Sequence, residues 1–458
     1  MNKISNRAWV IIALALVLAV GVCVFSVRYF ANAEDWVKFP GSPHLYSGAN
    51  PNTGTVIDRN GTLLLDATQD RTYSTDLSLR CATIHLLGDR FGYIDAPILG
   101  HFLNELVGYN PVNGLYGKKS ETRTAALTLS ANAQKTAYEL LKGKRGTVGV
   151  YNYKTGEILC AVSTPSYDPD HMPDVENDTT GAYEGVYVNR FLGSTYTPGS
   201  IFKTLTTAAA LETVPGIADM RFSCEGSCIV DGERITCNGV HGDQSLEQAL
   251  CNSCNCAYAQ IAQLVGGDVL QQYVTQIGVC DALSFDGTKT VKGKFDLTDA
   301  SNGSVCWAGI GQYTDLVNPC RFMVYMGMLA NGGKAAQPYL MASVFSEKQT
   351  AYSAKTVMLD SGLKASTTEQ LAVMMRNNVV TGYGAWQFPN LFVCGKSGTA
   401  ETAEGKPSNA LFAGFIQDAD YPLAFIVVVE EGGSGSGTAA PIAGKVLQAC
   451  VDDLSSNK

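Results

Sequence analysis

The sequence has few charged residues, and it has fewer basic than acidic ones. Asp, Glu, Lys and Arg make up 16% of the 458 residues, and 33 Lys and Arg against 42 Asp and Glu give a formal net charge of −9. An acidic chain without a long basic run is not expected to bind nucleic acid. Hydrophobic residues make up 46%, which excludes a wholly disordered chain. The sequence also lacks repeats of solenoid or propeller length, so we expect ordinary globular domains.

Long apolar runs are absent except for one near the N-terminus. Ala8–Val27 contains no charged residue, and a helix of this length spans a hydrocarbon core of roughly 30 Å. Lys3 and Arg7 precede it, which favours a cytoplasmic N-terminus, a single membrane pass and an extracytoplasmic remainder. A cleaved signal peptide is the alternative, because residues 31–33 read Ala-Asn-Ala. The run is longer than the roughly 7–15 residues of a signal-peptide core, which favours a retained anchor.

The chain divides into four parts by composition. Residues 1–30 are predicted to form the cytoplasmic tip and the anchor, and residues 31–52, with several Pro and Gly, a linker. Residues 53–140 are predicted to form a small N-terminal pedestal domain, which begins with a strand, an Asn-Gly turn and a second strand over 54–65. Residues 141–458 are predicted to form the functional domain.

Strand patterns lie at both ends of this last domain. Residues 147–153 and 157–163 indicate one hairpin, residues 410–417 and 423–430 a second, and residues 441–454 a closing helix. Alanine-rich helical stretches lie between them. This order predicts an α+β fold in which helices flank one antiparallel sheet.

Three short motifs carry the chemistry. Ser200-x-x-Lys203 places both side chains on one helical face, where the amine can deprotonate the hydroxyl. Ser253-Cys254-Asn255 lies in a break between two helical patterns, and Ser245 with Gln248 predicts a capping box for the first of them. Lys396-Ser397-Gly398-Thr399 follows the apolar residues 391–393, which predict a strand. Single copies of such patterns arise by chance, as in Ser361-x-x-Lys364. The order of the three motifs along the chain distinguishes them from chance matches.

With these motifs the sequence resembles the class B penicillin-binding proteins, the membrane-anchored transpeptidases of cell-wall synthesis. Further matching segments are residues 54–61 (GTVIDRNG), 164–169 (TPSYDP), 309–312 (GIGQ), 330–333 (ANGG) and 396–401 (KSGTAE). The short pedestal is similar to that of the compact branch called penicillin-binding protein A. The resemblance implies the fold of a penicillin-binding or serine β-lactamase-like transpeptidase domain.

The resemblance also implies a role for each motif residue. Ser200 attacks the D-Ala-D-Ala carbonyl of a peptidoglycan stem, Lys203 acts as base, and Ser253 relays the proton to the leaving amine. Asn255 orients Lys203, and Lys396 supplies positive potential. Ser397, Gly398 and Thr399 bind the substrate, which β-lactams mimic. No cofactor is implied for catalysis. A membrane-embedded glycan polymerase of the shape, division or sporulation class is the implied partner, contacting the anchor and the pedestal.

Three other functions share parts of this pattern. A class A β-lactamase needs a Glu-activated water, and no Glu-x-x-x-Asn element stands between the second and third motifs. A D,D-carboxypeptidase, which passes the acyl group to water, has the same motif residues. A β-lactam-binding sensor or scaffold without turnover is disfavoured by the complete motifs.

Fourteen cysteines are unevenly distributed along the chain. Six of them, with one histidine, fall within residues 224–256. Thiolate and imidazole in sets of four favour zinc, and we predict structural Zn²⁺ held by Cys224, Cys237, His241 and Cys254, with Cys228 as the replacement for any member. Such a site would fix the position of the second motif. Disulfides, for example Cys224 with Cys237, and free buried thiols remain the alternatives.

Overall fold

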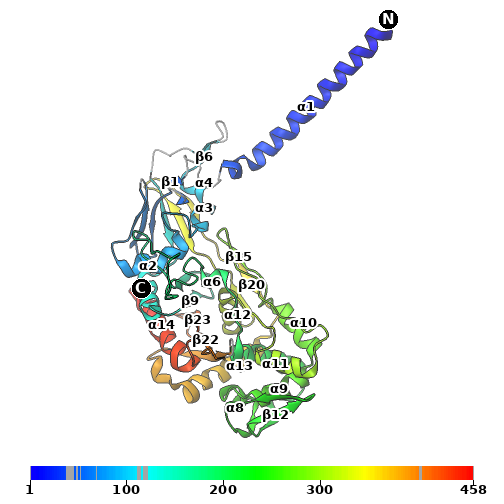
Figure 1. Cartoon of the computed structure of the whole chain (residues 1–458), viewed down its shortest axis with the longest axis vertical. Coiled ribbons are helices and arrows are strands. Elements are labelled where there is room, and N and C mark those ends of the chain that lie inside the picture. The colour runs from blue at the N-terminus through cyan, green and yellow to red at the C-terminus, as the bar shows by residue number, and fades with distance from the viewer. Residues whose placement is uncertain are drawn as a thin grey trace.

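The structure is a computed structural model that describes residues 2–37, 46–47, 50–51, 53–68, 70–110, 115–116, 122–401 and 405–456. A single long helix stands away from an elongated body, and the chain ends on the side of that body (Figure 1). The body contains two main sheets, with helices packed around the second of them.

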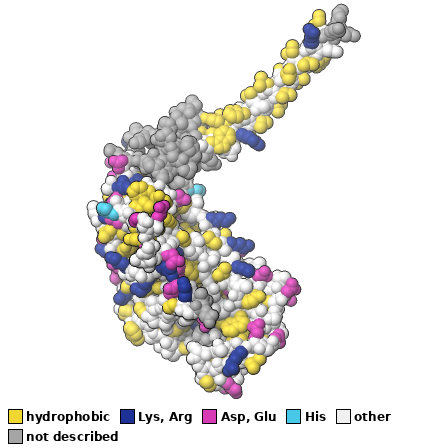
Figure 2. Space-filling model, viewed as in Figure 1, with side chains coloured by type: hydrophobic (Ala, Val, Ile, Leu, Met, Phe, Trp, Pro, Cys, Tyr) yellow, Lys and Arg dark blue, Asp and Glu magenta, His cyan; other side chains and the backbone are white. Residues whose placement is uncertain are grey.

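Helix α1 (Asn2–Val37) is the projecting element. Within residues 4–33 an 18-residue window has a mean hydropathy of 3.1, and no part of that window is buried inside the protein; hydrophobic side chains run along the helix in Figure 2. The predicted apolar helix over 8–27 is confirmed, and it is longer than predicted because the helix continues to residue 37. The first part of the predicted linker 31–52 is therefore helical, and most of its remainder lies outside the described residues.

The first main sheet has six strands in the order β19-β18-β8-β3-β4-β5. The strands are β3 (Gly54–Ile57), β4 (Leu63–Ala67), β5 (Thr72–Tyr73), β8 (Thr124–Leu127), β18 (Met341–Phe345) and β19 (Thr350–Ser353). The predicted strand–turn–strand over 54–65 is confirmed by β3 and β4. Strands β18 and β19 come from the second half of the chain, so this sheet is not confined to the residues predicted for the pedestal. The domain boundaries themselves stay a prediction.

The second sheet is antiparallel throughout, in the order β10-β9-β23-β22-β21. Its strands are β9 (Gly146–Asn152), β10 (Ile158–Thr164), β21 (Val393–Ala400), β22 (Asn409–Ile416) and β23 (Leu423–Val429). Every residue of β9, β10, β22 and β23 is buried, which requires cover on both faces. The predicted α+β fold with strands from both ends of the domain is confirmed.

Helices supply that cover. Helices α5 (Ala131–Leu141) and α14 (Ala440–Ser455) share one hydrophobic cluster with side chains of the sheet. Helix α12 (Pro319–Ala330), buried along nearly its whole length, packs against β23 and β22 with the other cluster. Further helices lie beyond α12: α7 (Lys203–Thr213), α8 (Leu246–Cys251), α9 (Asn255–Val265), α10 (Gly267–Ile277), α11 (Asn302–Ile310) and α13 (Ala365–Asn377).

Two local expectations differ from the structure. The first motif begins in a 3₁₀ turn, η1 (Gly199–Phe202), and the α-helix starts only at Lys203, so Ser200 and Lys203 do not share one regular helix. The third motif lies inside β21 and does not follow the strand, because the pairing of β21 with β22 continues as far as Ala400.

Two short hairpin ladders lie at the end of the body farthest from α1 (Figure 1). Strand β11 (Arg221–Cys224) pairs with β14 (Gly242–Ser245), and β12 (Ser227–Val230) pairs with β13 (Glu233–Thr236). The sequence analysis assigned no strands here. These ladders carry three of the clustered cysteines, Cys224, Cys228 and, directly after β13, Cys237.

Candidate active site

One cleft of about 540 Å³ brings the three motifs together. Ser200 lies on it from the first motif, Ser253 and Asn255 from the second, and Ser397 and Thr399 from the third. Lys203 and Lys396 are fully buried and reach the same cleft through hydrogen bonds to Ser253.

The turn before Ser200 is held tightly against its neighbours. Gly199 has φ +52°, and a Cβ at this position would lie 2.9 Å from the carbonyl oxygen of Thr399, so glycine is required here. The Gly199 N–H donates to the carbonyl oxygen of Gly311 (2.9 Å). Ser200 is half-buried, and within the described chain its hydroxyl forms no hydrogen bond with another residue. The hydroxyl therefore faces the cleft.

The second motif occupies the break between α8 and α9. The predicted capping box of Ser245 and Gln248 begins α8, and the thiol of Cys254 caps α9 by accepting from the Ala257 N–H. Ser253 stands between the two helices with φ +52°, a conformation that costs about 1–3 kcal/mol for a residue other than glycine. This backbone turn aims the Ser253 hydroxyl at both lysines.

Lys203 is bound entirely by the second motif. Its Nζ donates to the carbonyl oxygen of Ser253 (2.6 Å), to Asn255 Oδ1 (2.7 Å) and to Ser253 Oγ (3.2 Å). Burial lowers the pKa of Lys203 well below its usual value, and the neighbouring charge of Lys396 adds to the shift. Donation to all three oxygens requires the charged ammonium, whereas the neutral amine donates only to the carbonyl oxygen of Ser253 and to Asn255 Oδ1 and keeps a lone pair that can accept a proton.

Lys396 reaches Ser253 from the opposite side. Its Nζ donates to Ser253 Oγ (3.0 Å), to the carbonyl oxygen of Ser397 (2.9 Å) and to the hydroxyl oxygen of Tyr383 (3.4 Å). Burial lowers the pKa of Lys396 to about 7.

The predicted metal ligands meet beside the second motif. One ligand atom from each of Cys224, Cys237, His241 and Cys254 lies within 4.8 Å of all the others. His241 Nδ1 is 3.6 Å from Cys224 Sγ and 3.5 Å from Cys237 Sγ, and the sulfurs of Cys237 and Cys254 are 3.7 Å apart. The hydrogen bond between these two thiols lowers the pKa of Cys237 and raises that of Cys254.

This Cys/His cluster contacts the second motif directly. The backbone N–H of Asn255 donates to Cys237 Sγ (3.3 Å), and the Asn255 side chain donates to the carbonyl oxygen of Thr236 (2.9 Å). The cluster and its hairpins therefore fix the residue that binds Lys203. Cys228 lies outside the set of four.

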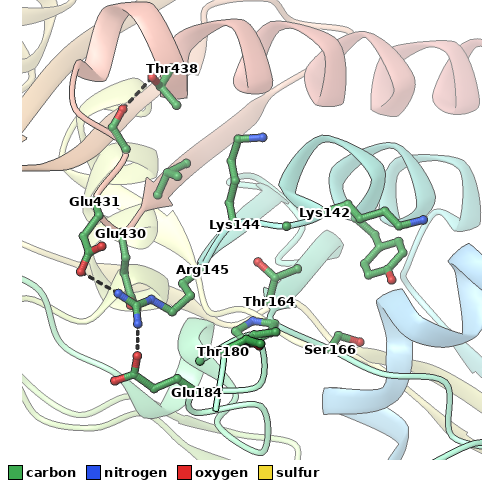
Figure 3. A pocket seen from close by; sticks show the side chains of 17 residues that line it. Lys142, Lys144, Arg145, Thr164, Ser166, Thr180, Glu184, Glu430, Glu431 and Thr438 are labelled. Carbon is green, nitrogen blue, oxygen red and sulfur yellow. Dashed lines mark hydrogen bonds and ion pairs between the residues drawn. The ribbon is translucent and has the colours of Figure 1, made fainter. Parts of the chain in front are cut away.

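Several residues of the cleft were not found by sequence reasoning. They are Trp307, Tyr383, Ser408, Ser434 and Ser436. The one usable signal was the glycine- and serine-rich run 432–437, whose composition is typical of a loop close to a ligand. A separate cavity of about 850 Å³ contains none of the predicted site residues; Arg145, Glu184 and Glu431 line it (Figure 3).

Comparison with known proteins is consistent with this cleft. The peptidoglycan D,D-transpeptidase PbpA of Mycolicibacterium smegmatis is 25% identical over 358 residues, which are 71% of this chain and 72% of that protein. The D,D-transpeptidase domain of a peptidoglycan glycosyltransferase from Eggerthella lenta superposes with a TM-score of 0.75 at 24% identity, covering 88% of this chain and 98% of that one. A penicillin G acyl-enzyme complex of penicillin-binding protein A from M. tuberculosis gives 0.72 at 22% identity, covering 87% and 99%.

The family profile described as "Penicillin binding protein transpeptidase domain" matches residues 146–448, well over half of the sequence. These residues include all three motifs and the whole of the second sheet. The chain belongs to the penicillin-binding protein transpeptidase family.

Proposed function

We propose that the protein is a peptidoglycan D,D-transpeptidase that cross-links stem peptides through an acyl-enzyme on Ser200. The observation that carries this proposal is the convergence of Lys203 and Lys396 on the hydroxyl of Ser253, in the cleft onto which Ser200 opens. Family membership supports the same function.

In the acylation step Ser200 Oγ attacks the carbonyl carbon of the penultimate D-alanine. Neutral Lys203 accepts the hydroxyl proton, since its depressed pKa leaves the amine unprotonated. Ser253 Oγ lies within hydrogen-bond distance of Lys203 and Lys396, so it can pass a proton to the nitrogen of the departing D-alanine as the C–N bond breaks. Asn255 Oδ1 holds Lys203 in place.

Hydrogen-bond donors on β21 and in the turn at Ser200 stabilise the negative charges of the oxyanion and of the substrate carboxylate. The backbone N–H groups of Ser200 and Thr399 stabilise the oxyanion. The substrate carboxylate, or that of a β-lactam, binds the hydroxyls of Ser397 and Thr399 under the positive potential of Lys396, while Gly398 permits close approach. An amine from a second stem then attacks the acyl-enzyme and frees Ser200.

Labelling with fluorescent penicillin tests this assignment. Wild type should form a covalent adduct, and Ser200→Ala should not. Ser361→Ala should label like wild type, because Ser361 belongs to a chance Ser-x-x-Lys match and its hydroxyl donates to the carbonyl oxygen of Gly333. Absence of labelling in wild type, or equal labelling of Ser200→Ala, refutes the acyl-enzyme. Release of D-alanine from a two-stem substrate without a cross-linked product would indicate a D,D-carboxypeptidase, and labelling without any turnover would indicate a sensor.

We further propose that α1 anchors the protein with its N-terminus in the cytoplasm and its catalytic domain outside. The charges of Lys3 and Arg7 support this orientation. Protease added to intact spheroplasts should digest the catalytic domain and leave the N-terminal tip. A membrane-embedded glycan polymerase is the proposed partner, and co-purification that survives replacement of both α1 and the pedestal surface would contradict contact through these parts.

We propose that the Cys/His cluster holds a structural Zn²⁺. Zinc bonds of about 2.3 Å to sulfur and about 2.0 Å to nitrogen separate tetrahedral ligand atoms by about 3.8 Å for two sulfurs and about 3.6 Å for sulfur and nitrogen. The measured separations of 3.7 Å between Cys237 and Cys254 and of 3.5 and 3.6 Å from His241 to its two thiols fit these values. The ion would fix the hairpins to the second motif.

Metal analysis of the protein purified without reductant tests the zinc site. We expect about one zinc per chain, lost in His241→Ala together with much of the penicillin acylation. Cys228→Ser, which alters a neighbouring thiol outside the set of four, should keep the metal. Metal-free protein with fewer titratable thiols than cysteines would instead indicate disulfides.

A further inference from the structure

Strand β21 is the last strand of its sheet, and part of its outer edge is covered by side chains. Beyond α13 the chain continues as a π-helical segment, η3 (Asn378–Gly384). Arg376 Nη1 donates to the carbonyl oxygen of Val393 (3.0 Å), and Asn378 Nδ2 donates to that of Gly395 (3.1 Å). The backbone N–H of Ser397 donates to the hydroxyl oxygen of Tyr383 (3.1 Å). These three side chains thus cover every second residue of the outer edge from Val393 to Ser397.

The next residue of this edge lies in the cleft, where Gln312 Nε2 donates to the carbonyl oxygen of Thr399 (3.3 Å). In an antiparallel strand the N–H and C=O groups of alternate residues point to the same side, so the N–H of Thr399 faces outward like that of Ser397. Thr399 lines the cleft, and the edge of a sheet pairs readily with an extended peptide. The substrate backbone therefore meets β21 at Thr399, directly after the residue that Tyr383 covers.

Tyr383 covers the edge N–H that precedes Thr399 and also contacts Lys396. Its hydroxyl oxygen accepts from Lys396 Nζ (3.4 Å) as well as from the Ser397 N–H. Its ring lies edge-on to Phe412, with the ring centres 5.6 Å apart. Burial raises the pKa of Tyr383 to about 12, so the group stays a neutral hydroxyl and its oxygen remains an acceptor for both donors.

We propose that Tyr383 is a positioning residue of the transpeptidase reaction, whose hydroxyl accepts from the Ser397 N–H and from Lys396 Nζ and so holds β21 in place where the substrate backbone pairs at Thr399. The inference rests on the proposed function of the cleft. Tyr383 makes no bond to the reacting atoms and acts through Ser397 and Lys396.

The consequence of losing the hydroxyl follows from its two hydrogen bonds. Without it the ring still covers this part of the edge, but the Ser397 N–H and Lys396 Nζ each lose an acceptor. The backbone beside Thr399 is then held less firmly. A bound substrate therefore places its carbonyl at Ser200 less often. The rate of acylation falls, whereas noncovalent affinity changes little.

Stopped-flow acylation of the full-length protein by a fluorescent penicillin separates these two quantities. For Tyr383→Phe we expect the acylation rate constant to fall about tenfold, the effect of one hydrogen bond, with the noncovalent dissociation constant changed less than about twofold. Tyr153→Phe is the matched control: it also removes a buried hydroxyl, one that donates to the carbonyl oxygen of Ile416 in the same sheet (3.3 Å), and it should acylate like wild type.

The outcomes separate this inference from the proposed function. Failure of wild type to acylate, or equal acylation of Ser200→Ala, refutes the acyl-enzyme itself. If wild type acylates and Tyr383→Phe has an unchanged rate constant, only the role of Tyr383 is refuted. Equal losses of rate in Tyr383→Phe and Tyr153→Phe, with equal losses of thermal stability, would also refute it, because both would then reflect general destabilisation.

Discussion

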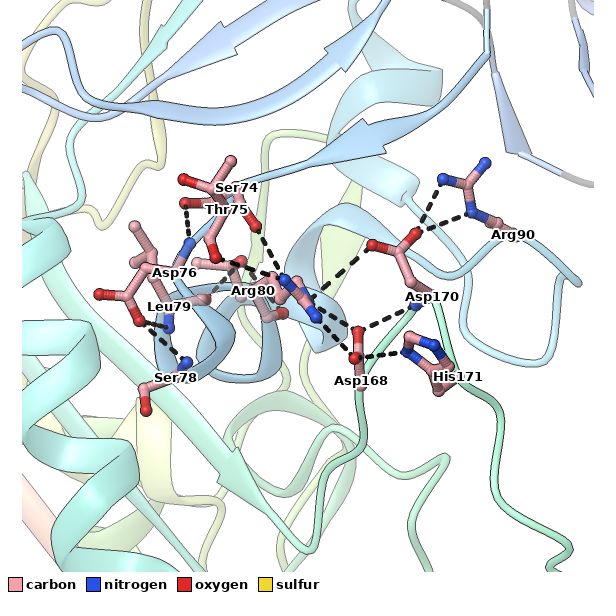
Figure 4. A network of polar contacts seen from close by, with 11 residues as sticks. Ser74, Thr75, Asp76, Ser78, Leu79, Arg80, Arg90, Asp168, Asp170 and His171 are labelled. Carbon is pink, nitrogen blue, oxygen red and sulfur yellow. Dashed lines mark hydrogen bonds and ion pairs between the residues drawn. The ribbon is translucent and has the colours of Figure 1, made fainter.

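Arg80 and Asp168 join two parts of the chain that are far apart in sequence. Arg80 lies on helix α2 (Leu77–Leu87) near the first sheet, and Asp168 follows β10 of the second. The guanidinium binds both carboxylate oxygens, each at 2.7 Å, and Figure 4 shows this pair at the centre of a polar network. The perturbation we consider is a double-mutant cycle of Arg80→Gln and Asp168→Asn.

The expected coupling energy follows from exposure and geometry. Fully exposed ion pairs contribute about 0.2–1 kcal/mol, and breaking a buried pair costs about 3–5 kcal/mol. Each of these side chains retains 16% exposure and the contact is bidentate, so we expect a coupling of about 2 kcal/mol in the free energy of unfolding. Denaturant titration of the four proteins measures it.

The pH dependence gives a second check. The hydrogen bond from Arg80 holds the pKa of Asp168 well below its usual 3.8. A lowered carboxyl pKa adds stability that is complete above the pKa of the unfolded chain and is lost as the pH falls toward the folded value. The coupling should therefore be equal at pH 7 and pH 5 and decline below about pH 4.

His171 provides the control for this cycle. Its Nδ1 lies 2.8 Å from the same carboxylate, but its side chain is 81% exposed, so His171→Ala should change stability by less than about 0.5 kcal/mol. Additive effects of the two main substitutions, that is, a coupling near zero at pH 7, would refute the reasoning.

Three further predictions concern buried charges. Within the described chain neither carboxylate oxygen of buried Asp315 has a hydrogen-bond partner, and burial raises the pKa of this carboxyl. A carboxyl with a raised pKa destabilises the folded protein as the pH rises, so Asp315→Asn should stabilise it by about 1–3 kcal/mol at pH 8 and little at pH 4. Equal thermal midpoints of wild type and variant at pH 8 would contradict this. The carboxylate of Glu430 accepts hydrogen bonds from Tyr196 Oη and Arg190 Nε, both at 2.8 Å, and Tyr196 precedes the turn that carries Ser200. Glu430→Gln should therefore slow penicillin acylation about 5–20-fold. Acylation of this variant at the wild-type rate would rule out the role. Because burial brings the pKa of Lys396 to about 7, affinity for the penicillin carboxylate should weaken as pH rises through that value, and a flat binding profile between about pH 6 and 9 would count against it.

Local features of the chain were predictable. The capping box of Ser245 and Gln248 and the hairpin of β9 and β10 are present as predicted, because each depends on residues a few positions apart. The apolar helix is confirmed for the same reason. Family membership could be inferred from the order of three motifs, and the match over residues 146–448 confirms it.

The composition of the Cys/His cluster was predictable in part. Local cysteine density selected Cys224, Cys237, His241 and Cys254, and the structure brings one ligand atom of each to within 4.8 Å of the others. That zinc occupies the cluster stays a prediction. The hairpins that carry the cysteines could not be predicted, because each of their strands has only four residues, too few for a periodic pattern to stand out.

Long-range pairing lay beyond the sequence. Strands β18 and β19 complete a sheet begun almost three hundred residues earlier, and strand neighbours of that separation leave no local pattern. Tyr383 could not be distinguished from the other tyrosines, since its contacts with Lys396 and Ser397 depend on where the π-helical segment meets β21.

The sequence by itself determined the apolar N-terminal helix, the strands at both ends of the second sheet and the order of the three motifs, because periodicity and spacing act over a few residues. The tertiary structure alone decided how those residues behave. It buries Lys203 and Lys396 beside one another, and burial lowers the pKa of both; it turns Ser253 to φ +52° so that both amines reach its hydroxyl. Desolvation and close contact between distant segments exist only in the folded chain; they lower the pKa of the two lysines and bring both amines to one serine hydroxyl.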